Sequence, residues 1–125
     1  MTRDARQPPD VPEPKAPYSP VVVSGPFAYT SGQVAFGPDG TLVAGGVEEQ
    51  TRQVFQNIGE ILKAGGTSFD GVVTATVYLA DMNDFAKVNE IYATYFSSPA
   101  PARATVQVAR LPKDCLVEIQ VIASL

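Results

Sequence analysis

Apolar residues recur at helical spacing in segment 47–64, and they predict one amphipathic helix. Most of these positions lie three, four or seven residues from another, which places them on one helical face. They are Val47, Val54, Phe55, Ile58, Ile61 and Leu62. Gly65 and Gly66 follow directly, where a residue in the left-handed conformation commonly ends a helix. We therefore expect a helix over residues 47–64.

Segment 72–79 predicts a strand, because β-branched side chains dominate it and none of its residues is charged. A run of this kind is typical of a strand that is buried on both faces or nearly so. Two short strands are predicted within residues 21–34, on either side of the turn Ser24-Gly25-Pro26. Residues 103–110 and 115–124 predict two more strands around the turn Leu111-Pro112-Lys113-Asp114.

A second, shorter helix is predicted after the strand that ends at Leu79. Asp81, Asn83 and Asp84 are candidate N-caps, because a short polar side chain can accept a hydrogen bond from a free backbone N–H group. The apolar stripe of this helix comprises Phe85, Val88, Tyr92 and Phe96. The predicted element order is therefore β-β-α-β-α-β-β. This order indicates an α+β fold in which two helices cover one face of a mixed sheet.

The first 17 residues differ from the rest of the chain. They contain five prolines among mixed charges, and proline fixes φ and cannot donate a backbone hydrogen bond. We interpret residues 1–17 as a flexible, Pro-rich N-terminal tail. Residues 18–125 are then expected to form a single domain, which suits a chain of 125 residues.

Composition limits the chemistry that the chain can perform by itself. It contains no histidine, which excludes Ser-His-Asp catalysis and histidine-bound zinc or haem within the chain. The single cysteine, Cys115, excludes an internal disulfide and favours a reducing, cytoplasmic location. A formal charge of −4 and the lack of a basic run argue against binding of nucleic acid. No apolar run approaches the length of about 20 residues that spans a membrane.

Five short strings occur in a fixed order along the chain, and together they are more specific than the pattern of elements. They are Pro17-Tyr18-Ser19, Thr30-Ser31-Gly32-Gln33, Asn83-Asp84-Phe85 with Val88-Asn89, Pro101-Ala102-Arg103, and Leu111-Pro112-Lys113-Asp114 followed by Val117-Glu118-Ile119. With these strings the chain resembles the reactive-intermediate deaminase (Rid) family, also called YjgF-like or L-PSP-like. The resemblance runs from about Tyr18 to Ser124, which is nearly the whole chain apart from the tail.

The resemblance implies a fold, an assembly and an activity. The fold would be chorismate-mutase-like, and three copies would form a homotrimer with ligand clefts between adjacent subunits. The activity would be hydrolysis of reactive enamines and imines, such as 2-aminoacrylate and 2-iminopropanoate, to a 2-keto acid and ammonia, without a cofactor. Carried over by position, the site would use Tyr18, Ser31, Gly32, Asn89, Arg103 and Glu118.

The residue types agree with that chemistry. A guanidinium binds a carboxylate through two parallel charge-assisted hydrogen bonds, so Arg103 suits the acid end of an α-imino carboxylate. Glu118 would orient or deprotonate the attacking water. The hydroxyls of Tyr18 and Ser31 would relay protons or hold the amino group, and Gly32 would let a backbone N–H group approach closely. Thr105 stands where the family often has a cysteine, and it keeps a hydroxyl of similar size beside the substrate.

Strand geometry separates Arg103 from Glu118 within one chain. If residues 111–114 form a four-residue hairpin loop, Glu118 lies opposite Gln107. Arg103 is four residues from Gln107, which is roughly 13 Å along a strand at about 3.3 Å per residue. We therefore hypothesise that the site is shared between chains.

Other interpretations stay open from the sequence alone. Arg103 would have an ordinary structural role if it paired with a surface acid, and Glu118 would have one if it lay on an exposed strand face. Tyr18, Ser31 and Asn89 would have one as a packing anchor, a turn residue and a local helix contact. The chain as a whole would be a non-catalytic metabolite-binding trimer if turnover had been lost. The family also carries the label of endoribonuclease, and a bulkier imine or enamine is another candidate substrate.

Overall fold

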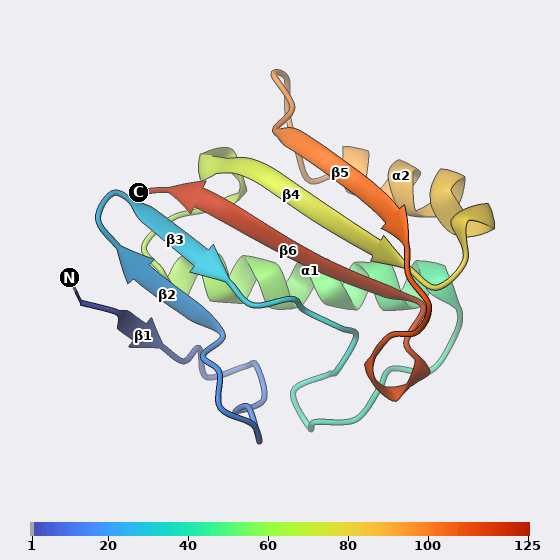
Figure 1. Ribbon diagram of the computed structural model, residues 1–125, viewed down its shortest axis with the longest axis horizontal. Coiled ribbons are helices and arrows are strands. Elements are labelled where there is room, and N and C mark those ends of the chain that lie inside the picture. The colour runs from blue at the N-terminus through green and yellow to red at the C-terminus, as the bar shows by residue number, and fades with distance from the viewer. Residues whose placement is uncertain (1) are drawn as a thin grey trace.

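The computed structural model describes residues 2–125, which fold around one six-stranded mixed sheet (Figure 1). The order of strands across the sheet is β1-β2-β3-β6-β4-β5, and only β4 and β5 run parallel. The strands are β1 (Asp4–Arg6), β2 (Val21–Ser24), β3 (Phe27–Thr30), β4 (Val72–Leu79), β5 (Ala102–Gln107) and β6 (Val117–Ser124). The predicted order of seven elements and the α+β class are confirmed, with β1 as an additional strand.

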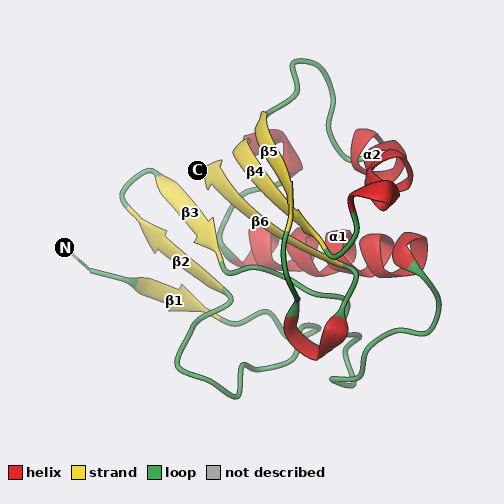
Figure 2. Ribbon diagram, turned by 45° about the vertical axis from the view of Figure 1, so that its right-hand side comes forward, coloured by secondary structure: helices red, strands yellow, loops and turns green. Residues whose placement is uncertain are grey.

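Two helices, α1 (Val47–Ala64) and α2 (Phe85–Ala93), lie on the same side of the sheet (Figure 2). The core forms between them and the strands, and it includes the fully buried Phe55, Ile58, Leu79 and Ile119. Aromatic rings fill the space between the two helices, where Phe55 stacks on Tyr95 with ring centroids 4.4 Å apart. The helices therefore bury one face of the sheet and leave the other face without a cover from this chain.

Helix α1 has the bounds that the sequence predicts, and local contacts explain both of its ends. At the start, the Gly46 backbone N–H group donates to the Glu49 carboxylate at 2.7 Å, as in a capping box. At the end, Gly66 adopts a φ of +86°, the left-handed conformation that glycine takes without a steric cost. The residues between them bury one face, which includes Val54, Phe55 and Ile58.

The predicted pairing of the last two strands as a hairpin is wrong. Strand β6 lies between β3 and β4, whereas β5 lies on the far side of β4. Strand β6 alternates buried and partly exposed residues as a central strand does, while β5 has only partly buried or exposed residues, as an edge strand does. The link between them is a short 3₁₀ turn, Pro112–Asp114, with Lys113 and Asp114 at positive φ. This turn leads the chain across the end of β4 instead of back along β5.

The N-terminal segment differs from the predicted flexible tail. Its residues 4–6 pair with Val21–Val23 of β2 as a sixth strand, and Arg6 donates a hydrogen bond to the Ala64 carbonyl at the end of α1, at 3.0 Å. Val11 is 7% exposed and packs with Val21, Ala28 and Ile61. The prolines did not prevent this docking, because they lie between the paired strand and β2 and leave residues 4–6 free to donate and accept.

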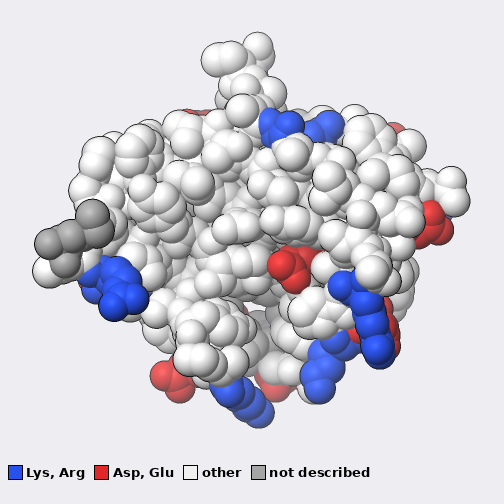
Figure 3. All heavy atoms as spheres, in the orientation of Figure 1, with Lys and Arg blue, Asp and Glu red and all other residues white. Residues whose placement is uncertain are grey.

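The sheet face opposite the helices stays partly exposed, which corrects the expectation that β4 is buried on both faces. Thr74, Thr76 and Tyr78 of β4 point to this face and are only half-buried. The strands lie in front of α1 in Figure 1, so the same view in Figure 3 shows this face, and its middle is largely uncharged. We call it the open face; its side chains include Val22, Tyr29, Tyr78, Val106 and Ile122. None of the helices within residues 2–125 has the length and apolar content of a membrane span.

Candidate active site

Gly32 and Glu118 lie against each other where the chain leaves β3. Gln33 forms a bridge to Ile119 of β6, with its N–H group donating to the Ile119 carbonyl at 2.8 Å and its carbonyl accepting at 3.1 Å. This pairing sets Gly32 beside Glu118. A Cβ atom at position 32 would overlap carboxylate oxygen Oε2 of Glu118. Because Gly32 has no side chain, the Glu118 carboxylate can occupy the space beside it.

Ser31 and Tyr18 lie next to this pair. The Ser31 hydroxyl donates to the Ser19 carbonyl at 2.6 Å, and the Ser31 N–H group donates to the Pro20 carbonyl at 2.9 Å. These two bonds hold the segment before β2 against the end of β3. The Tyr18 side chain is 55% exposed and stands at the rim of this group. The Ser31 hydroxyl proton is therefore used in a hydrogen bond to a backbone carbonyl, and the hydroxyl oxygen can still accept a hydrogen bond.

Burial raises the pKa of the Glu118 carboxyl above its ordinary value, and burial is the sole cause. Removal of water disfavours the charged form of a carboxyl group. No arginine or lysine among residues 2–125 forms an ion pair with Glu118 to oppose this effect. Glu118 therefore tends to hold a proton at a higher pH than a carboxyl in water, which suits a group that accepts and returns protons.

Arg103 lies in a second group of residues, between β5 and α2. Its Nη1 donates to Asn89 Oδ1 at 2.6 Å. The carbon of the guanidinium group lies 4.7 Å from the ring centroid of Tyr92 and 5.5 Å from that of Phe85. These distances are within the range of cation–π attraction. No acid of the described chain pairs with Arg103, so its positive charge stays available to an anion.

Thr105 shares the Arg103 face of β5, because the two residues are two positions apart. Its hydroxyl is buried and has no hydrogen-bond partner among residues 2–125, and the same holds for the hydroxyl of Tyr92. Burial raises the pKa of Tyr92, and the charge of Arg103 opposes that rise. The hydrophobic pattern predicts Tyr92 and Phe85 only as part of the apolar stripe of this helix. The spacing of 85, 89 and 92, which places three residues on one helical face, was the signal for their contact with Arg103.

The two groups do not meet within one chain. Arg103 pairs with Ala75 of β4 and shares the helix-covered face, whereas Glu118 pairs with Tyr78 and shares the open face. Two strand spacings and three residues along β4 separate their Cα atoms by roughly 14 Å. The expectation that Arg103 does not contact Glu118 within a chain therefore agrees with this geometry, although the hairpin on which it was based does not form.

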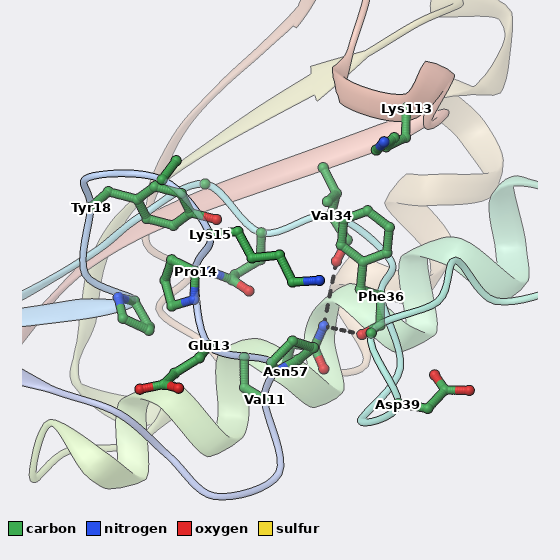
Figure 4. Close-up of a pocket in the computed structure, with 16 residues that line it drawn as sticks. Val11, Glu13, Pro14, Lys15, Tyr18, Val34, Phe36, Asp39, Asn57 and Lys113 are labelled. Atoms are coloured by element: carbon green, nitrogen blue, oxygen red, sulfur yellow. Dashed lines mark hydrogen bonds between the residues drawn. The ribbon is translucent and has the colours of Figure 1, made fainter.

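A cavity of about 510 Å³ adjoins the Glu118 group and opens beside Tyr18 and Gly32 (Figure 4). The segment before β2 forms one wall, from which Lys15 projects inward toward Asn57 of α1. The Asn57 side chain is fixed there, because it donates to the Phe36 carbonyl at 2.8 Å. No cluster of metal-ligating side chains occurs within residues 2–125.

This chain is similar to known proteins over most of its length. The family model described as Endoribonuclease L-PSP matches residues 9–125, so the match begins inside the predicted tail. A 2-iminobutanoate/2-iminopropanoate deaminase of Mus musculus is 56% identical over 108 residues, which cover 86% of this chain and 80% of the relative. A RutC family protein of Pyrococcus horikoshii is 50% identical over 115 residues, 91% of each chain. The crystal structure of RidA from Psychrobacter sp. PAMC 21119 has a TM-score of 0.93 at 42% identity, covering 98% of this chain and all of the other.

Proposed function

This chain belongs to the Endoribonuclease L-PSP (Rid) family, and we propose that it hydrolyses reactive 2-imino acids, such as 2-iminopropanoate, to a 2-keto acid and ammonia. The mammalian relatives at 53–56% identity are named as deaminases of such imines. The observation that carries the proposal is the state of Arg103. Its guanidinium is held by an amide oxygen and two aromatic rings and has no acid partner among the described residues. Such a group is ready to bind a carboxylate.

In this proposal Arg103 holds the acid end of the substrate. Charge-assisted hydrogen bonds are worth roughly 1.5–3 kcal/mol each, and two of them supply most of the affinity that a three-carbon acid can gain. The same contact fixes the imine carbon relative to the rest of the site, because a bidentate pair restrains both position and direction. Asn89 then supports Arg103, since its side-chain oxygen already accepts from Nη1.

Glu118 activates the water in this proposal. The water oxygen forms a bond to the imine carbon, one water proton passes to the Glu118 carboxylate, and the imine nitrogen takes up a proton from solvent to become an amine. The Glu118 proton then passes to that amine and the carbon–nitrogen bond breaks, with its electron pair leaving on ammonia. The hydroxyl returns its proton to solvent and becomes the keto group. The raised pKa of Glu118 favours the return of its proton to the amine, because a carboxyl with a raised pKa holds a proton more readily than one in water.

The remaining predicted residues take supporting roles. Tyr18, at the rim, donates its exposed hydroxyl to the substrate nitrogen or to the water. Ser31 accepts a hydrogen bond at its oxygen, since its proton is used by Ser19. Gly32 provides space for Glu118, and Thr105 presents its buried hydroxyl on the Arg103 side.

We further propose that the protein is a homotrimer whose sites lie between subunits. A three-carbon acid cannot span the roughly 14 Å between Arg103 and Glu118, and these residues occupy opposite faces of one sheet. A neighbouring copy must therefore supply one of the two groups. The open face provides a largely uncharged surface for that copy, with exposed apolar side chains such as Tyr29 and Val106. The buried, unpaired Cys115 fits a reducing compartment, and we place the reaction in the cytoplasm.

The test is the rate of 2-keto acid formation from freshly generated 2-iminopropanoate. We expect the wild-type protein to accelerate it strongly over the spontaneous reaction. Arg103→Ala should lose about 10²–10⁴ in kcat/KM, since it removes two charge-assisted hydrogen bonds. Arg103→Lys keeps the charge without the bidentate geometry, so its kcat/KM should lie between those of the wild type and Arg103→Ala. Glu118→Gln should lose about 10²–10⁴ in kcat.

Two other results would contradict the proposal. Saturable binding of a keto acid without acceleration of imine hydrolysis would support a non-catalytic metabolite-binding protein. RNA cleavage that survives Arg103→Ala and rigorous repurification would support the nuclease activity that the family description names.

A further inference from the structure

Helix α2 presents three side chains to Arg103, and they are spaced as one face of a helix. Phe85, Asn89 and Tyr92 lie at positions i, i+4 and i+7 of this face. Each of them contacts the guanidinium group: Asn89 by a hydrogen bond, and Phe85 and Tyr92 through their rings. We call these three residues the α2 cradle.

The α2 cradle holds the guanidinium without neutralising it. A carboxylate at the same place would form an ion pair and compete with a carboxylate ligand for the same donors. An amide oxygen and two aromatic faces attract a cation but carry no net charge. A guanidinium has five N–H donors, and the Asn89 bond uses one of them. The cradle thus fixes the group and leaves donors and charge for a ligand.

The two rings of the α2 cradle differ in how firmly they are themselves held. Tyr92 is 6% exposed, and its ring packs on Phe96 and Phe55 with centroids 4.6 and 5.9 Å away. Phe85 is 37% exposed at the start of the helix. The Tyr92 ring therefore connects the end of the long, exposed Arg103 side chain to the buried aromatic core. Its hydroxyl makes no hydrogen bond to residues 2–125, so the ring alone carries this connection.

We propose that Tyr92 is a positioning residue that acts through Arg103. Its aromatic face sets the plane of the guanidinium, so that the free donors meet the substrate carboxylate in one fixed orientation. This inference rests on the proposed function for the identity of the ligand. Phe85 completes the arrangement from the exposed side, and Asn89 fixes one nitrogen.

The experiment compares Tyr92→Leu, which removes the aromatic face but fills the core, with the matched control Tyr92→Phe, which keeps the ring. Binding of two ligands is measured by calorimetry: pyruvate, which has a carboxylate, and its uncharged methyl ester. We expect Tyr92→Leu to weaken pyruvate binding about tenfold and to leave the ester within about twofold. Tyr92→Phe should leave both affinities within about twofold, because the hydroxyl has no partner among the described residues.

Equal weakening of both ligands by Tyr92→Leu, or no weakening of pyruvate, would overturn the proposal. If Tyr92→Leu does not fold, Tyr92→Met, which also fills the core without an aromatic ring, answers the same question. About tenfold selective loss of pyruvate affinity is expected, and no selective loss would contradict the proposal. Activity of the wild type is measured alongside. A wild type that binds pyruvate through Arg103 but does not hydrolyse the imine would refute the proposed function, and the selective loss in Tyr92→Leu would still decide the role of Tyr92.

Discussion

At the scale of single residues, the contact of Gly32 with Glu118 shows why glycine stands at position 32. The backbone of Gly32 does not have the positive φ that favours glycine at Gly25, Gly40, Gly45 and Gly66. What requires glycine is the space that the Glu118 carboxylate fills. The string Ser31-Gly32 was recognised from the sequence through the family resemblance. Its partner was not, because the contact depends on the pairing of Gln33 with Ile119 across the sheet.

Gly32→Ala should damage catalysis more than folding. The new Cβ displaces the Glu118 carboxylate, and a misplacement of about 1 Å can cost about 100-fold in rate. We expect kcat to fall by about that factor while KM changes little, because Arg103 is on the other face of the sheet. Steady-state kinetics on 2-iminopropanoate measure both. A normal kcat in Gly32→Ala would contradict the assignment of Glu118 as the proton-transfer group.

The raised pKa of Glu118 gives the protein a pH-dependent stability with a definite sign. Because the pKa of this carboxyl is higher in the folded than in the unfolded chain, the folded state binds more protons between the two values. The wild type therefore loses stability as the pH rises from the ordinary value of 4.5 through the raised pKa. Glu118→Gln lacks this titration. Urea unfolding at several pH values should show that the free energy of unfolding of the variant rises relative to that of the wild type as the pH increases. A difference between the two free energies that does not change with pH would count against a raised pKa.

At the scale of elements, the hydrophobic pattern predicts the bounds of those elements that depend only on their own residues. Helix α1 and strand β4 have their predicted bounds, because a helical stripe and a β-branched run are local properties. The partners of β5 and β6 were not predictable in this way, since a short turn fits both a hairpin and a crossing to another strand. The sequence does not predict strand β1, because the five prolines of residues 8–17 indicate an extended tail for the whole segment 1–17. Residues 4–6 themselves carry no proline.

Val11→Ala tests whether the N-terminal segment is docked. Val11 is buried against Val21 and Ile61, and removing two methyl groups from such a place should cost about 1–2 kcal/mol of unfolding free energy. A flexible tail would give no change. Glu13→Ala, at an exposed position nearby, is the control and should stay within about 0.5 kcal/mol of the wild type. Denaturant unfolding with unchanged m-values measures both variants.

At the scale of the whole molecule, the sheet separates the two groups that the proposed reaction needs together. Arg103 belongs to the helix-covered face and Glu118 to the open face, with β4 between them. The sequence predicted their separation along the chain but not their placement on opposite faces, because that depends on β6 entering the middle of the sheet. The proposed cyclic assembly would resolve the separation, since one interface repeated by symmetry would join each Arg103 to a Glu118 of the next copy.

Mixing two inactive variants tests this arrangement directly. Arg103→Ala and Glu118→Gln each remove one half of every site. When equal amounts are unfolded and refolded together, about a quarter of the interfaces receive an intact Arg103 from one copy and an intact Glu118 from the next. We expect about a quarter of the wild-type activity in the mixture. The variants refolded separately and then combined for the assay are the control and should remain inactive. No recovery on joint refolding would mean that the site is not shared.

The uncovered side of the sheet also affects the life of a newly made chain. In a single chain, Tyr29 and Val106 face water, and the outer edge of β5 has no neighbouring strand among residues 2–125. Apolar strands with a free edge are the surfaces through which chains stick together irregularly. If the chain assembles as we propose, these surfaces are exposed in the interval between folding and assembly. Crowding by unrelated unfolded protein during that interval should lower the yield of active material even when the final, assembled protein is stable.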